Sequence, residues 1–110
     1  MNIPVFYLLI VILLVIYFYN NSKSKKATKI LGNGGVVIDV RTPQEFKAGN
    51  YKSSINIPLN NIEDNIDKIK SFKKNIVVVC ASGMRSGKAN KILNKYDIKS
   101  INGGSWSNLK

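Results

Sequence analysis

The chain opens with a long apolar block and continues with short apolar runs separated by polar segments. Ile3 to Tyr19 contains no charged residue. As a helix rising about 1.5 Å per residue, this block would extend about 25 Å, against about 30 Å for the hydrocarbon core of a bilayer. The pattern predicts an N-terminal transmembrane anchor within residues 1–22. One folded domain over residues 23–110 would follow, beginning with a short basic juxtamembrane linker up to Lys26.

The charges beside this block predict its orientation. No Lys or Arg precedes the block, whereas four lysines follow it closely: Lys23, Lys25, Lys26 and Lys29. A cleaved signal peptide would need a basic start and a small-residue cleavage site, and Asn20 to Lys23 is a poor match. The positive-inside rule then predicts a single-pass membrane protein with its C-terminal domain in the cytoplasm.

The remaining pattern alternates between strands and helices. Two apolar runs have the form of buried parallel strands, and each ends at a chemically useful residue: Val36 to Ile38 before Asp39, and Ile76 to Val79 before Cys80. Other segments predict a capping box at Thr42–Glu45, an extended piece at Ser54–Pro58, helices at Ala27–Leu31, near Ile62–Phe72 and around Ala89–Tyr96, and a last strand at Ile98–Ile101. The expected fold is α/β, a parallel sheet flanked by helices, with Asp39 and Cys80 at the carboxyl ends of strands.

Composition narrows the chemistry further. The chain has one cysteine and no histidine, which excludes an intramolecular disulfide, a His-based triad and an ordinary zinc site. We expect no metal and no other cofactor. The net charge is +11, but the basic residues do not form the aromatic-interleaved stripe that is typical of nucleic-acid binding, so we expect no nucleic-acid partner. The excess of positive charge is better explained by attraction to anionic lipid.

The segment after the second strand is the best candidate for a catalytic loop. It runs Cys80-Ala81-Ser82-Gly83-Met84-Arg85-Ser86, with small residues whose backbone N–H groups can form an anion-binding nest. A helix N-terminus follows, and Arg85 adds a permanent positive charge. Together these groups should lower the pKa of Cys80 and stabilise its thiolate. The alternatives are a buried structural thiol at Cys80 and a solvated surface charge at Arg85.

This loop strongly resembles the active-site loop of the rhodanese family, in which S-G-x-R-S follows shortly after a cysteine. Three further segments resemble the family's other signatures in the same order: Val37–Phe46, Ile55–Leu59, and Asn102–Gly104 with Trp106. The sequence departs from the family pattern at Gly49-Asn50-Tyr51, where members usually have Gly-His-Ile. That departure concerns the wall of the pocket rather than the cysteine.

The resemblance implies a sulfurtransferase or persulfide carrier. Cys80 would take the outer sulfur of a small anionic donor such as thiosulfate and pass it to cyanide, a thiol or a protein acceptor. By the same resemblance, the substrate-binding residues are Arg85 and the loop residues Ala81, Ser82, Gly83, Met84 and Ser86. Asp39 and Arg41 are expected in supporting, structural roles rather than in substrate binding. Glu45 is expected to cap a helix, and Trp106 to be a core residue.

Two other functions remain open. One is a non-catalytic rhodanese-like module that binds a partner in sulfur relay or redox signalling. The other, which loop length disfavours, is a cysteine-dependent phosphatase or arsenate reductase. Four residues separate Cys80 from Arg85, whereas the related phosphatases use five and form a wider ring that encloses a tetrahedral phosphate.

Overall fold

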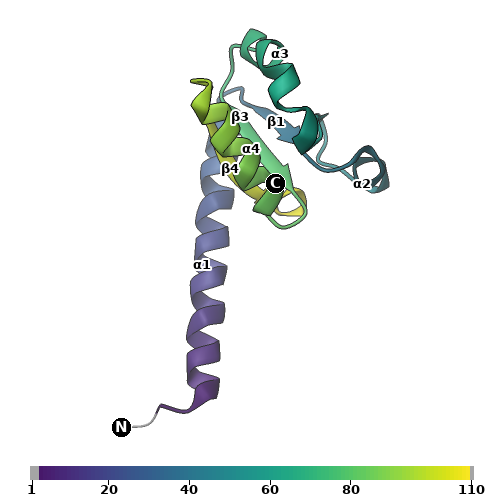
Figure 1. Ribbon diagram of the computed structural model, residues 1–110. Coiled ribbons are helices and arrows are strands. Elements are labelled where there is room, and N and C mark those ends of the chain that lie inside the picture. The colour runs from purple at the N-terminus through teal and green to yellow at the C-terminus, as the bar shows by residue number, and fades with distance from the viewer. Residues whose placement is uncertain (1–2, 110) are drawn as a thin grey trace.

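The core of the protein is a four-stranded parallel sheet. The computed structural model describes residues 3–109, without the side chains of residues 20–24. The strands are β1 (Val36–Asp39), β2 (Ile55–Asn56), β3 (Ile76–Cys80) and β4 (Ser100–Ser105), and they lie in the order β2-β1-β3-β4 (Figure 1). All three pairings are parallel. The predicted α/β fold is therefore confirmed.

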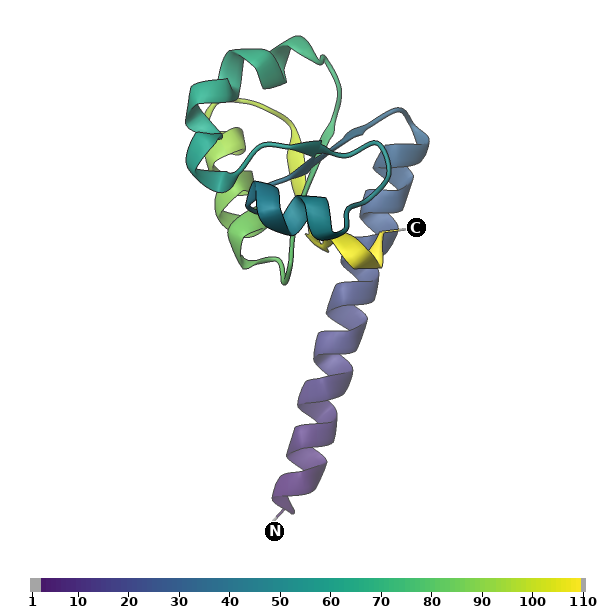
Figure 2. The ribbon, with the colours of Figure 1, turned by 90° about the vertical axis from the view of Figure 1, so that its right-hand side faces the viewer.

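Helices cover both faces of this sheet (Figure 2). They are α1 (Val5–Gly32), α2 (Pro43–Ala48), α3 (Ile66–Ser71) and α4 (Met84–Lys95), joined by the 3-10 turns η1 (Leu59–Asn61), η2 (Glu63–Asn65) and η3 (Trp106–Asn108). Ile38, Val78 and Cys80 face a core that also contains Ile69 of α3 and Leu93 of α4. The alternate strand residues Val37, Val77 and Val79 face Ala27 of α1 and Leu109. This alternation follows from the two-residue period of a strand.

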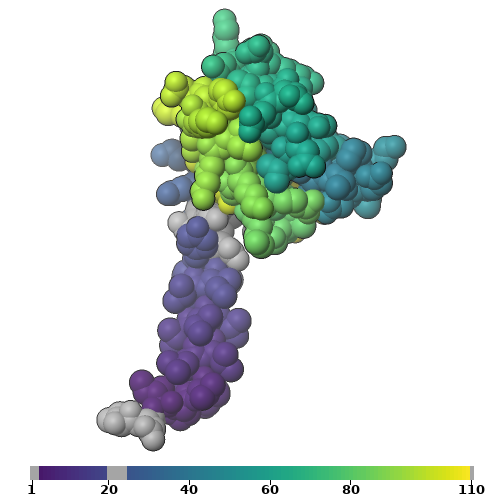
Figure 3. Space-filling model, in the orientation of Figure 1, coloured from purple at the N-terminus to yellow at the C-terminus, as the bar shows by residue number. Residues whose placement is uncertain are grey.

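The N-terminal helix differs most from the prediction. Helix α1 runs without interruption from Val5 to Gly32, so the predicted linker up to Lys26 is helical and the predicted helix at Ala27–Leu31 is its last part. The apolar side chains from Ile3 to Tyr19 are exposed, and the first half of α1 projects from the domain (Figure 3). Among the described residues, no helix combines the length and the apolarity required to cross a membrane.

The predicted transmembrane anchor is therefore not confirmed. The cytoplasmic location of the domain stays a prediction.

Two further boundaries were predicted wrongly. The segment expected to be one helix near Ile62–Phe72 begins as two 3-10 turns, and only Ile66–Ser71 is α-helical. Strand β4 begins at Ser100 rather than Ile98 and continues through Gly103 and Gly104. Gly103 lies within van der Waals reach of the neighbouring strand, since a Cβ there would come 2.6 Å from a methyl carbon of Val77. A glycine pair that looks like the end of a strand therefore allows close packing inside it.

The sheet brings the two candidate strand ends together as predicted. Asp39 of β1 is in register with Val79 of β3, and Cys80 is the next residue of β3. Both strands run in the same direction, so Asp39 and Cys80 emerge at the same edge. That edge is where parallel α/β sheets bind ligands.

Candidate active site

Cys80 lies where β3 passes into α4. The loop between them is only Ala81 to Gly83, because Met84, Arg85 and Ser86 already form the first turn of the helix. Gly83 is the N-cap residue and has a φ of 103°, a left-handed conformation that favours glycine. The cysteine is fully buried.

Hydrogen-bond donors from the loop and the start of α4 surround the Cys80 sulfur. The backbone N–H of Gly83 donates to Sγ at 2.9 Å, and the buried hydroxyl of Ser86 lies 3.4 Å from it. Burial raises the pKa of the Cys80 thiol. However, hydrogen bonds from the Ser86 hydroxyl and from the backbone N–H groups of Ser86, Gly83 and Ser82 outweigh burial, so the pKa lies below its ordinary value. The loop therefore favours the nucleophilic thiolate.

Arg85 does not point freely into the loop. Its Nη1 and Nη2 donate to Oε1 and Oε2 of Glu45 at 2.6 and 2.9 Å. This fork-to-fork pairing raises the pKa of Arg85 and, with the Thr42 backbone N–H, lowers the pKa of Glu45 to about 2. Glu45 also completes the predicted capping box with Thr42 at the start of α2. One carboxylate thus caps α2 and neutralises the loop arginine.

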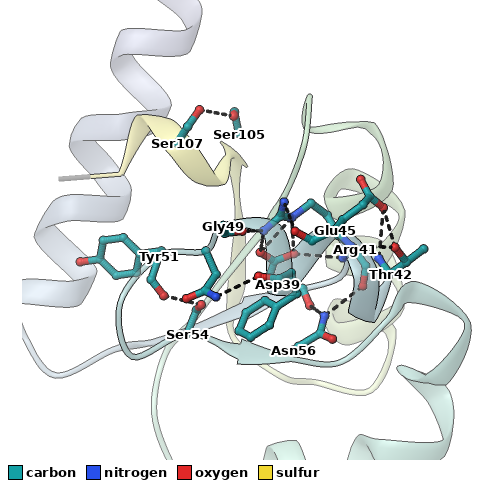
Figure 4. Close-up of polar contacts among 12 residues, drawn as sticks. Asp39, Arg41, Thr42, Glu45, Gly49, Tyr51, Ser54, Asn56, Ser105 and Ser107 are labelled. Atoms are coloured by element: carbon teal, nitrogen blue, oxygen red, sulfur yellow. Dashed lines mark hydrogen bonds and ion pairs between the residues drawn. The ribbon is translucent and has the colours of Figure 1, made fainter.

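Asp39 and Arg41 form a second pair, inside the protein (Figure 4). The Asp39 carboxylate accepts from the backbone N–H of Arg41 and from its Nε and Nη2, the last at 2.7 Å. Nη2 also donates to the Gly49 carbonyl, which ties β1 to the end of α2. From β2, the Asn56 side chain donates to the carbonyls of Asp39 and Arg41. These bonds all lie within the fold, in keeping with a supporting role.

The residues at the family departure are also accommodated structurally. Asn50 donates to the Phe46 carbonyl at the C-terminal end of α2, and Tyr51 packs against the cluster around Val77 and Val79. Trp106 packs partly buried against the same cluster, and the Arg41 guanidinium lies 4.7 Å from its ring centroid.

The predicted site residues separate into two groups. The Ser86 hydroxyl and the backbone N–H groups of the loop face the sulfur, whereas Ala81, Ser82 and Met84 have exposed side chains. The prediction missed the pairing of Glu45 with Arg85 and the contacts of Asn102, described below. Both depend on residues brought together by the sheet across long stretches of sequence, and only the Asn102-Gly103-Gly104 signature marked one of them.

A hollow elsewhere does not belong to this site. It has a volume of about 440 Å³ and is lined by four lysines, Lys70, Lys73, Lys74 and Lys99. Gly35 and Asn75, which precede β1 and β3, also line it. It therefore lies at the amino ends of the strands, opposite Cys80.

Comparison with known proteins agrees with the fold. A model of the rhodanese-like domain family matches residues 20–107, and the chain belongs to this family. A Schizosaccharomyces pombe protein provisionally named a mitochondrial thiosulfate sulfurtransferase is 41% identical over 85 residues, covering 64% of this chain and 60% of the relative. The thiosulfate sulfurtransferase PspE of Escherichia coli is 36% identical over 59 residues, covering 53% and 57%.

A solved structure supports the same relationship. A rhodanese with anions from E. coli superposes with a TM-score of 0.63 at 28% identity, covering 68% of this chain and 91% of that one. The chain spans less than two thirds of the length of both curated relatives. The match over residues 20–107 therefore establishes the family of the domain. The activity of the whole protein is proposed below.

Proposed function

We propose that this chain is a sulfurtransferase that moves sulfane sulfur through a persulfide on Cys80. The observation that carries the proposal is the setting of Sγ, which accepts the Gly83 N–H and faces the Ser86 hydroxyl at the start of α4. The names of the yeast and E. coli relatives support the same reaction class. Neither the mechanism nor the donor follows from family membership alone.

In the first half-reaction, the Cys80 thiolate attacks the outer sulfur of thiosulfate. A Cys80–sulfur bond forms, the sulfur–sulfur bond of the donor breaks, and sulfite leaves with its electron pair. The backbone N–H groups of the loop and the dipole of α4 would stabilise negative charge on the sulfur that is gained. No oxidant or cofactor is needed, because sulfane sulfur moves between two nucleophiles.

In the second half-reaction, an acceptor nucleophile attacks the outer sulfur of the persulfide. Cyanide would leave as thiocyanate, and a thiol would leave as a persulfide. The Cys80 thiolate departs with the bonding electrons and again meets the Gly83 N–H. Because the sulfur stays on the protein between the two steps, ping-pong kinetics are expected.

A persulfide carrier is the second candidate, and a specific observation favours it. Arg85, the natural attractor for an anionic donor, is already paired in bidentate fashion with Glu45. An arginine that is already neutralised suits a protein that receives sulfur from an adjacent protein better than one that captures free thiosulfate rapidly.

Phosphatase chemistry has less support. Only four residues separate Cys80 from Arg85, and α4 begins before the arginine, at Met84. With its guanidinium on Glu45, Arg85 is not arranged to hold a phosphate. Aryl phosphate hydrolysis that depends on Cys80 and exceeds sulfur transfer would overturn the sulfurtransferase proposal.

Mass spectrometry of the full chain after exposure to thiosulfate tests the proposal. We expect the wild type to gain one sulfur atom at Cys80 and the Cys80→Ser variant to gain none, since an unactivated hydroxyl is a far poorer nucleophile than a thiolate. Transfer that survives in Cys80→Ser would refute the mechanism. Addition of cyanide then separates the two candidates, because an enzyme turns over repeatedly whereas a carrier discharges once and recharges slowly.

A further inference from the structure

Asn102, on β4, uses both ends of its side-chain amide at the catalytic loop. Its Oδ1 accepts from the Ser86 hydroxyl at 2.7 Å and from the backbone N–H of Gly104 at 2.9 Å. Its Nδ2 donates to the Gly83 carbonyl at 2.9 Å. The two backbone partners fix the orientation of the amide, because a carbonyl can only accept and an N–H can only donate.

Two of the three residues that Asn102 contacts, Gly83 and Ser86, also contact the sulfur. Gly83 places its N–H on Sγ, and Ser86 places its hydroxyl near Sγ. Asn102 therefore hydrogen-bonds to both residues that donate to the sulfur, to the same hydroxyl in Ser86 and to the carbonyl in Gly83.

Glycines make this close approach feasible. A Cβ on Gly87 would come within 3.3 Å of the Asn102 Nδ2, and a Cβ on Gly83 would come within 3.4 Å of the Gly104 Cα. A side chain at Gly87 would press on the Asn102 amide, and a side chain at Gly83 would be strained by the positive φ of that residue. The absence of side chains at Gly83 and Gly87 thus lets β4 pack closely enough for the Asn102 amide to contact the loop.

The Ser86 hydroxyl has one proton and two acceptors. Asn102 Oδ1 lies at 2.7 Å and Cys80 Sγ at 3.4 Å, and both are hydrogen-bond distances for their acceptors. An amide oxygen is a stronger acceptor than the sulfur of a neutral thiol, so in the resting thiol the hydroxyl donates to Asn102. When the thiolate forms, the hydroxyl must turn to donate to sulfur. The oxygens of Ser86 and Asn102 are then left facing each other without a proton between them, which opposes the turn.

We propose that Asn102 is a positioning residue that competes with the Cys80 sulfur for the Ser86 hydroxyl proton and thereby sets how readily the nucleophilic thiolate forms. Through the Gly83 carbonyl it also holds the peptide on which α4 begins. The inference rests on the proposed sulfur transfer for its biological meaning, but its physical content concerns the thiol alone.

A double-mutant cycle separates the two effects of Asn102. The variants are Asn102→Ala, Ser86→Ala and the double variant, each made in the full chain. The readout is the pH midpoint of the ultraviolet absorbance of the thiolate, which needs no alkylating reagent to reach the buried sulfur. The signal is assigned to Cys80, the sole cysteine, by subtracting the titration of Cys80→Ser, which removes the contribution of the five tyrosines. In the Ser86→Ala background, Asn102→Ala removes only the hold on Gly83 and Gly104.

Asn102→Ala shifts the thiolate midpoint by some amount in each background. We expect the shift with Ser86 present to be more negative, by about half a pH unit to one unit, than the shift in the Ser86→Ala background. Asn90→Ala is the matched control. It removes a similar bond, from the Ser100 hydroxyl to Asn90 Oδ1 at 2.6 Å, away from the sulfur, and should leave the midpoint unchanged. Circular dichroism checks that each variant is folded.

Equal shifts in both backgrounds, or a coupling of the opposite sign, would overturn the role of Asn102. The outcome is independent of the proposed function, since persulfide formation is measured separately by mass spectrometry. Coupling without persulfide formation would keep the role of Asn102 and refute sulfur transfer. Persulfide formation without coupling would support sulfur transfer and refute the role of Asn102.

Discussion

Two arginine–carboxylate pairs lie at helix α2, and they differ strongly in burial although both are bidentate. Arg41 uses Nε and Nη2, and Arg85 uses Nη1 and Nη2. Asp39 and Arg41 approach to 2.7 Å with side chains 0% and 5% exposed. Glu45 and Arg85 approach to 2.6 Å, with side chains 36% and 35% exposed. Both arginines use a forked guanidinium against both carboxylate oxygens. Similar contacts therefore occur in very different dielectric surroundings.

The difference in burial indicates which of the two pairs contributes more to the stability of the fold. Removing one partner of a buried pair leaves an uncompensated charge in a poor solvent, whereas an exposed pair is screened by water and salt. Arg41 additionally fixes the Gly49 carbonyl and lies over Trp106. The inner pair accordingly stabilises the carboxyl edge of the sheet, and the outer pair adjusts the charge at the mouth of the loop.

The largest expected effect comes from breaking the inner pair. Arg41→Ala should lower the free energy of unfolding by about 3–5 kcal/mol, because Asp39 stays buried without its partner. Urea denaturation followed by circular dichroism measures it, in a mild detergent because of the exposed apolar side chains of α1. Arg85→Ala is the matched control and should cost several-fold less. Equal losses would contradict the comparison.

The second prediction asks what lowers the pKa of Cys80. If the loop hydrogen bonds dominate, the wild-type alkylation midpoint should lie below the ordinary value of about 8.5, and Arg85→Ala should leave most of that shift in place. The lowered pKa means that thiolate formation favours the folded state above about pH 8.5, and that this contribution disappears as pH falls through the folded value.

Ser86→Ala should raise the midpoint by about one unit, because it removes the side-chain donor to the sulfur. A wild-type midpoint at or above the ordinary value would indicate an inert buried thiol. A larger change in Arg85→Ala than in Ser86→Ala would show that the outer pair, not the loop, controls the sulfur.

The third prediction concerns the charge of the incoming reagent. Iodoacetate and iodoacetamide alkylate by the same reaction and differ in charge. Glu45→Gln frees Arg85, so the ratio of the iodoacetate rate to the iodoacetamide rate should rise about 3-fold, as expected for one unit charge at several ångströms in a largely aqueous setting. Arg85→Ala should lower the ratio, and added salt should reduce both changes. An unchanged ratio in both variants would exclude Arg85 from attracting anionic donors.

The sequence revealed the elements whose signals are local. The run Ile76–Val79, the capping box of Thr42 and Glu45, and the spacing of Cys80 and Arg85 each depend on neighbouring residues. The parallel arrangement followed from the alternation of strands and helices. These features suffice to bring Asp39 and Cys80 to one edge of the sheet, as the register shows.

What escaped the sequence depends on distant partners. Glu45 and Arg85 lie 40 positions apart, and Ser86 and Asn102 lie 16 apart, so no periodicity indicates that they meet. Gly103 looked like a strand end because its use, close contact with Val77, exists only in the folded sheet. The lysines after Tyr19 suggested a linker, although lysine is a good helix former and α1 continues through them.

The smallest effect on the fold is expected from titration of the outer pair. The Arg85 guanidinium and the Thr42 N–H lower the pKa of Glu45 to about 2, so whatever the pair adds to stability is present above the unfolded pKa near 4.3 and is lost as pH falls through about 2. Carbon-detected NMR of the Glu45 carboxyl should therefore give a midpoint near 2. In Arg85→Ala the midpoint should rise towards 4.3, and Arg85→Lys, which keeps the charge without the planar fork, should fall between. A wild-type midpoint near 4.3 would mean that Glu45 does not hold Arg85 in solution, which would leave that arginine free to meet an anionic donor.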